Sequence, residues 1–187
     1  MAALISLGVT VGVLVIVGLF VMSIYNNLVS LDQEVQNAWS QIDVQLKRRH
    51  DLIPNLVDTA KGYMEHEQET LQKVTEARQQ AVNASSVQEQ AQAEGELSGA
   101  LSRLMAVSED YPDLKANENM MELQQELEDT ENKISTVRQK YNDHVMQLNE
   151  AIQKFPNNMF AGMFGFEEAE FFEIEDPKER EAPDVEF

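Results

Sequence analysis

Apolar side chains fill the start of the chain almost without interruption. Residues 4–24 contain no charged side chain, and only glycine, serine and threonine separate the Val, Leu, Ile, Met and Phe residues. A helix of this length rises about 30 Å, which is the thickness of the hydrocarbon core of a bilayer. We therefore expect residues 1–26 to form a single transmembrane anchor.

The alternatives to an uncleaved anchor fit this segment less well. A cleaved signal peptide carries a positively charged start and a small-residue cleavage site. No Lys or Arg precedes Lys47, and Val21–Tyr25 lacks an A-x-A pattern. A buried core helix would be shorter and amphipathic.

The orientation of the anchor cannot be derived from the positive-inside rule, because no basic residue lies near either end of the apolar segment. A short uncharged N-terminal tail is easily translocated, which favours a cytoplasmic soluble domain.

Beyond the anchor, apolar residues recur at steps of three and four, the pattern of amphipathic helices. The spacing predicts helices over residues 27–62, 65–83, 87–109 and 116–155. No Gly or Pro lies between Gly18 and Pro54, so the first of these helices should continue straight out of the membrane. The apolar stripe of the last helix is close to a coiled-coil heptad.

The predicted break between the second and third helices depends on two signals. The apolar phase of residues 65–83 does not continue into the stripe that restarts at Val87. Ser86 and Glu89 have the spacing of a capping box, which marks a helix start. One long helix with a stutter is the alternative interpretation.

These patterns predict an all-α fold. Amphipathic helices joined by short connections bury their stripes against one another, so the N-terminal transmembrane helix should run into an antiparallel bundle over residues 27–156.

The C-terminal tail, residues 157–187, changes character twice. Residues 157–166 are apolar and contain two glycines, whereas residues 167–187 hold ten acidic and two basic side chains. The acidic part is either disordered or, because aromatic residues are interspersed, docked on the bundle or on a partner. The apolar part is a candidate contact segment for another subunit or for the membrane; its large side chains are Met159, Phe160, Met163, Phe164 and Phe166.

Charge and composition narrow the classes of partner. The formal net charge is −19, from 33 acidic and 14 basic residues. This balance disfavours nucleic acid, which requires a basic patch, and it also disfavours electrostatic adhesion to anionic lipid. The chain has no cysteine, so it has neither a disulfide framework nor a thiolate metal site.

The sequence offers no constellation typical of catalysis. His66-Glu67-Gln68-Glu69-Thr70 begins like a zincin helix, but Thr70 stands where the second histidine is needed. The three histidines fall on three different predicted helices, where solvated or capping positions are expected. We therefore predict no enzyme, no catalytic residue, no cofactor and no metal.

Charged residues nevertheless occur on or beside the apolar stripes. Arg49 falls on the stripe of the first predicted helix, and Glu131 and Arg138 flank that of the last. An unpaired buried charge is costly, so we hypothesise that Arg49 or Arg138 pairs with an acid such as Glu131 and fixes helix register. The alternative is that the arginines extend to water.

Several runs of residues resemble the LemA family over nearly the whole chain. The run from Ala38 to Val57 reads AWSQIDVQLKRRHDLIPNLV, and later runs read EDYPDLKA at 109–116 and PDVEF at 183–187. His50 stands where the family more often has tyrosine. The resemblance implies an N-terminal transmembrane helix, an antiparallel four-helix bundle and a place in a bacterial cell (inner) membrane. It implies no established enzymatic activity, and some family members help to form or shape bacterial membrane compartments.

Two functions follow as hypotheses. The first is a membrane-tethered scaffold that forms a homo-oligomer and organises or curves the bilayer. Gly8 and Gly12 have the spacing that lets two membrane helices approach closely. The second is an adaptor that presents a groove or its acidic tail to another membrane protein, such as a protease or transporter. A hydrolase with a hidden site is the least favoured alternative.

Overall fold

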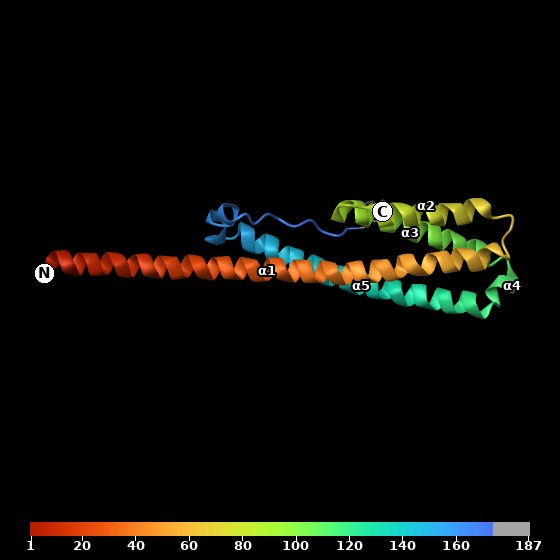
Figure 1. Cartoon of the computed structure of the whole chain (residues 1–187), viewed down its shortest axis with the longest axis horizontal. Coiled ribbons are helices and arrows are strands. Elements are labelled where there is room, and N and C mark those ends of the chain that lie inside the picture. Colours follow the sequence, from red (N-terminus) through yellow and green to blue (C-terminus); the bar gives the residue numbers. More distant parts are fainter. Residues whose placement is uncertain (174–187) are drawn as a thin grey trace, which may run out of the picture. The chain divides into compact units, whose positions relative to one another are not determined.

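The computed structural model describes residues 1–173, and all regular structure in that range is helical (Figure 1). The long elements are α1 (Ala2–Lys61), α2 (Gln68–Asn83), α3 (Val87–Ser108) and α5 (Glu118–Gln153). The short ones are α4 (Pro112–Lys115) and the 3₁₀ turns η1 (Asn157–Met159) and η2 (Gly162–Phe164). The predicted all-α class is confirmed.

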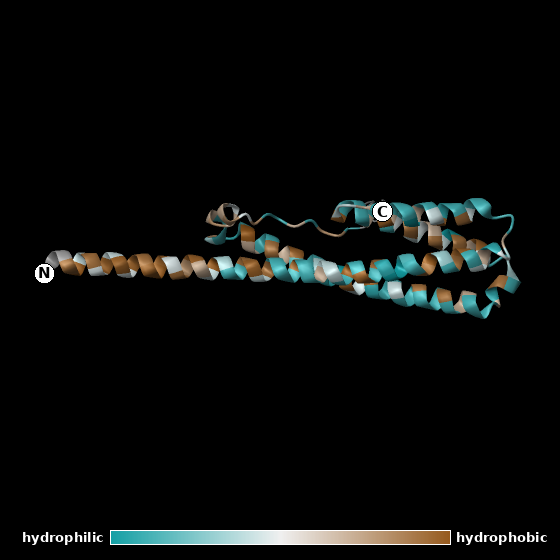
Figure 2. Ribbon diagram, in the orientation of Figure 1, coloured by the Kyte–Doolittle hydropathy of each residue, from teal (hydrophilic) through white to brown (hydrophobic). Residues whose placement is uncertain are grey.

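Helix α1 runs without a break over 60 residues, continues through Pro54, and ends just before Gly62. Apolar residues cover its N-terminal part on all sides, whereas the later turns alternate between apolar and polar (Figure 2). Between Leu4 and Met22, thirteen large apolar side chains are each more than half exposed. Within the described residues 1–173, this part of α1 is therefore uncovered.

The chain divides into two compact units. Unit 1 comprises Met1–Trp39 and Lys140–Ala169; unit 2 comprises Ser40–Gln139 and Glu170–Phe187, of which the structure describes residues up to 173. Helices α1 and α5 contribute residues to both units, so the helices of the predicted 27–156 bundle are shared between them. Residues 174–187, most of the predicted acidic tail, lie outside the described residues.

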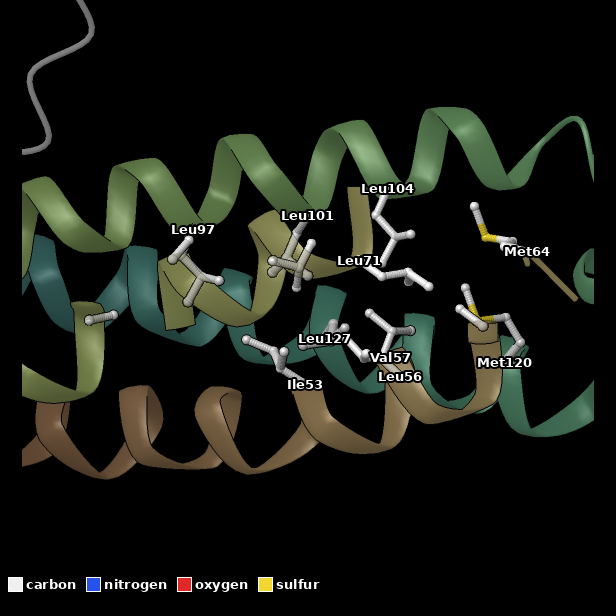
Figure 3. Packing of buried hydrophobic residues seen from close by; sticks show 14 of the residues in the cluster. Ile53, Leu56, Val57, Met64, Leu71, Leu97, Leu101, Leu104, Met120 and Leu127 are labelled. Atoms are coloured by element: carbon white, nitrogen blue, oxygen red, sulfur yellow. The ribbon is translucent and has the colours of Figure 1, made fainter. Parts of the chain in front are cut away.

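Unit 2 is a four-helix arrangement of α2, α3 and the facing parts of α1 and α5. An apolar cluster to which all four helices contribute forms a large part of its core (Figure 3). The chain directions of α1 and α5 are opposed, because Arg48 pairs with Glu126 while Tyr63, just after α1, accepts a hydrogen bond from Asn117. The labelled core residues are Ile53, Leu56, Val57, Met64, Leu71, Leu97, Leu101, Leu104, Met120 and Leu127.

The break between α2 and α3 lies where the sequence predicts it. The Ser86 hydroxyl accepts a hydrogen bond from the backbone N–H of Glu89 at 3.1 Å, so Ser86 caps α3. The Glu89 carboxylate reaches back one residue further than a standard capping box requires. It accepts from the backbone N–H and the hydroxyl of Ser85, at 2.9 and 2.7 Å.

This cap gives unit 2 a pH-dependent element. Hydrogen bonds from Ser85 lower the pKa of Glu89 below its ordinary value of 4.5, with the hydroxyl contributing most. A carboxyl whose folded pKa is lowered stabilises the fold above its unfolded pKa, and this stabilisation is lost as the pH falls through the folded pKa. We expect Glu89→Gln to lose this part of the acid dependence below pH 4.5, measured as unfolding midpoints by circular dichroism. Glu96→Gln on the exposed face of α3 is the control, and equal changes in both variants would contradict the assignment.

Several predicted helix bounds need correction. The second helix begins at Gln68 rather than 65, because residues 62–67 form a turn, and His66 therefore lies in that turn and not on a helix. Between the third and the last predicted helix, where no helix was predicted, the structure contains the short helix α4 with Pro112 in its first turn, a position that proline favours. The last helix begins at Glu118 and ends at Gln153.

In unit 1, α1 and α5 pack side by side with opposed directions. The ring centroids of Trp39 and Tyr141 lie 5.4 Å apart at one end of this contact. At the other end, the chain beyond α5 folds against α1, where Ile24 and Leu28 bury themselves with Ala161. The Asn149 side chain then holds the following segment through two hydrogen bonds to the Ala169 backbone, at 2.8 and 3.0 Å.

Candidate functional site

The uncovered part of α1 is the first candidate site. It is the one helix among the described residues that is long and apolar enough to cross a membrane. Gly8 and Gly12 lie on it, and a Cβ atom built on either glycine would meet nothing within 4 Å. The predicted packing positions are thus open within the single chain, while their role in self-association stays a prediction.

The predicted contact segment lies against α1 directly after this apolar stretch. Tyr25 makes edge-on ring contacts with Phe164 and Phe166, at centroid distances of 5.2 and 5.9 Å. Phe160 stacks on Phe164 at 6.4 Å, and Gly165 adopts a left-handed conformation that closes η2. The aromatic rings therefore fasten the segment to α1.

The other large side chains of this segment point to solvent. Met159 is 64% exposed and Met163 is 70% exposed, while Phe155 just before them is 78% exposed. Aromatic contacts therefore hold one side of the segment against α1, while the other side exposes large apolar side chains to solvent.

The second candidate site is a buried ionic network in unit 2. The Arg49 guanidinium donates to the Glu94 carboxylate at 3.0 Å and to the Ser98 hydroxyl at 2.8 Å. The same guanidinium lies 3.1 Å from Glu131 on α5. The Arg49 side chain is 5% exposed and that of Glu94 is 1% exposed, so this pair is removed from water. Three helices, α1, α3 and α5, meet through one arginine.

A histidine and two further side chains complete the network. His50 Nε2 lies 2.6 Å from the second oxygen of the Glu94 carboxylate. Gln90 donates to that oxygen and to the Ala81 carbonyl, each at 3.1 Å. Arg78 donates to the His50 carbonyl at 2.7 Å, which brings in α2. All four helices of unit 2 are therefore connected around Glu94.

The predicted polar residues separate into two groups. Arg49 and Glu131 lie within ion-pair distance, whereas Arg138 is half-buried on α5 and has no carboxylate within 4.0 Å in residues 1–173. The expectation that the histidines are solvated is wrong for His50, which is only 8% exposed. Sequence reasoning missed Glu94 altogether, although its place between Ala91 and Leu97 on the apolar stripe of α3 was a usable signal.

The network opens onto a groove of unit 2. This groove has a volume of 610 Å³ and runs between α3 and α5. Leu101, Met105 and Leu127 give it an apolar floor, and Lys115 and Glu128 are among the charged residues at its walls. Such a mixed lining suits a peptide segment with both apolar and charged side chains.

A continuous helix with an uncovered apolar end, followed by a bundle of antiparallel helices, defines the class of a membrane-associated helical protein. The particular family follows from comparison with known sequences. The model of the LemA family matches residues 38–187, and the chain belongs to that family.

Curated relatives agree with this assignment. Magnetosome protein MamQ 2 of Paramagnetospirillum magneticum is 28% identical over 175 aligned positions, and the match covers 80% of this chain. Magnetosome protein MamQ of Magnetospirillum gryphiswaldense is 25% identical over 174 positions and 79% of this chain. Protein LemA of Metamycoplasma hominis is 32% identical over 141 positions and 73% of this chain. The chain spans 63–64% of the length of these relatives.

Proposed function

We propose that this protein is a membrane-anchored, non-enzymatic scaffold that self-assembles and organises or shapes the bilayer. The observation that carries the proposal is the uncovered apolar part of α1 from Leu4 to Met22. Full burial of one such side chain is favourable by about 1.5–3 kcal/mol. A bilayer is the environment that removes this whole stretch from water, and its length matches the hydrocarbon thickness.

One feature of α1 supports self-assembly. The open face at Gly8 and Gly12 allows another helix to approach closely within the membrane, where packing contacts drive association. We propose that the bundle lies on the cytoplasmic side of a bacterial cell membrane.

Charged substitutions in the anchor test the membrane part of the proposal. We expect the double variant Leu14→Arg/Ile16→Arg to lose stable insertion, because each arginine near the helix centre costs about 2.5–3.5 kcal/mol. The measurement is cell-free synthesis with lipid vesicles, followed by an alkaline wash and flotation. Asn37→Arg, at an exposed polar position of the same helix, is the matched control and should float with the vesicles. Equal flotation of the double variant would argue against a membrane-spanning α1.

An adaptor function is the second candidate, and the groove between α3 and α5 favours it. Its apolar floor and charged walls provide a place for a segment of another membrane protein. In this case the protein would be a monomer that co-purifies with one partner, and substitutions in the groove such as Met105→Glu would release that partner. A scaffold would keep its assembly in the same variant.

A further inference from the structure

We propose that residues 155–166, here called the interfacial segment, lie on the bilayer surface as a second membrane contact beside the α1 anchor. The inference rests on the proposed membrane anchoring and adds a lipid-binding surface to it. The occupant of the exposed apolar side of this segment is the interfacial layer of the same bilayer that α1 crosses.

The position of the segment along α1 supports a location at the depth of the lipid headgroups. Met22 is the last apolar residue of the uncovered stretch, and Ala161 packs between Ile24 and Leu28. At 1.5 Å per residue, these two residues lie about 3–9 Å beyond Met22 along the helix axis. The polar layer on each side of a bilayer is about 5–8 Å thick, as the difference between its full and hydrocarbon thickness indicates. The contacts of unit 1 therefore hold the segment at headgroup depth.

The exposed side chains fit that layer. Phe155, Met159 and Met163 are all more than 60% exposed, although they are large and apolar. Aromatic residues such as Tyr25 are enriched at the boundary between hydrocarbon and water, and here Tyr25 fastens the segment through its contacts with Phe164 and Phe166. A bilayer surface would cover the methionines without any change in these ring contacts.

The charge pattern separates this contact from ordinary electrostatic adhesion. Residues 155–166 contain no charged side chain; Lys154 precedes them and Glu167 follows. Lys154 is itself paired with Glu150. Binding should therefore depend on apolar burial and not on anionic lipid, in agreement with the acidic net charge of the chain.

The absence of cysteine from the sequence allows a direct test. We would introduce Met163→Cys into the full chain, attach an environment-sensitive fluorophore, and reconstitute the protein in phosphatidylcholine vesicles that contain nitroxide-labelled lipids. Met159→Cys is the second variant, Leu14→Cys the reporter of the anchor, and Asn37→Cys an exposed control in unit 1 about 22 Å beyond Met22 along α1. Circular dichroism verifies that each variant keeps its helix content.

We expect the labels at 159 and 163 to be quenched several-fold more by a nitroxide near the headgroup than by one at the end of the acyl chain. The label at Leu14 should show the opposite preference, and the label at Asn37 should respond only to aqueous iodide. Replacing a third of the lipid with phosphatidylglycerol should leave the pattern unchanged.

Three results would overturn the inference. Labels at 159 and 163 that behave like Asn37, while Leu14 is quenched by lipid, would leave the anchor in place and reject the surface contact. Labels shielded from both lipid nitroxide and iodide would assign the surface to a second copy of the chain. A Leu14 label exposed to iodide would reject the membrane anchor itself, and the surface contact with it.

Discussion

Replacing Glu94 with alanine is expected to destabilise the protein by about 3–5 kcal/mol, because the buried Arg49 guanidinium then keeps only the half-exposed Glu131 as its counterion. The Glu94 side chain is 1% exposed and receives hydrogen bonds from Arg49 and Gln90, with His50 at 2.6 Å. Among the described residues no other carboxylate is buried to this degree, so none can take its place. The measurement is the free energy of unfolding in urea for the full chain in detergent.

The partly exposed acid of the same network is the matched control. Glu131 contacts the same guanidinium, but its side chain is 49% exposed, so Glu131→Ala should cost no more than about 1 kcal/mol. The double replacement Arg49→Met/Glu94→Leu should recover most of the stability lost in Glu94→Ala, since it removes both buried charges. Similar losses for Glu94→Ala and Glu131→Ala would contradict the buried-network interpretation.

The second large effect concerns the apolar core of unit 2. Met120 is fully buried in the cluster of Figure 3, and Met120→Ala should cost about 2–5 kcal/mol through lost burial and the cavity left behind. Its neighbour Met121 is 49% exposed, so Met121→Ala changes the same side chain without opening the core. The latter should change stability by less than about 0.5 kcal/mol.

Urea titrations of the two methionine variants provide the comparison. The difference between them isolates burial, since helix, residue type and substitution are the same. Equal unfolding free energies would mean that Met120 is not part of a packed core.

Helix positions followed from sequence because each depends on local signals. The apolar phase shift and the capping-box spacing of Ser86 and Glu89 were sufficient to predict the break before α3. Helix α4 was missed because four residues contain too few apolar positions to show a period. The turn at residues 62–67 was assigned in part to helix for the related reason that acidic residues near a helix start suit either state.

The buried network was only half predictable. A buried ion pair of Arg49 could be predicted because Arg49 interrupts an apolar stripe, and Glu131 was a candidate for its partner. Glu94 interrupts the stripe of α3 in the same way, but small alanines surround it and it was not singled out. Which acid pairs with which arginine depends on the mutual register of helices separated by more than 40 residues, and no local pattern encodes that register.

The position of the interfacial segment along α1 follows from the lengths of α1 and α5. Helix α5 has 36 residues, and the last 36 residues of α1 begin at Asn26, next to Tyr25. Because α1 and α5 run in opposite directions, α5 ends near this point of α1, and residues that follow α5 contact α1 here, as Tyr25 and Phe164 do. The direction of the exposed methionines, by contrast, depends on the 3₁₀ turns and could not be read from the sequence.

The measurement that tests the scaffold proposal most directly is the absolute mass of the full-length protein in mild detergent by light scattering, beside a chain that starts at Asn27. We predict a large and narrow mass for the full chain and a smaller one for the shortened chain, because the anchor face at Gly8 and Gly12 contributes to assembly. A monomer in both cases would contradict self-assembly and favour the adaptor.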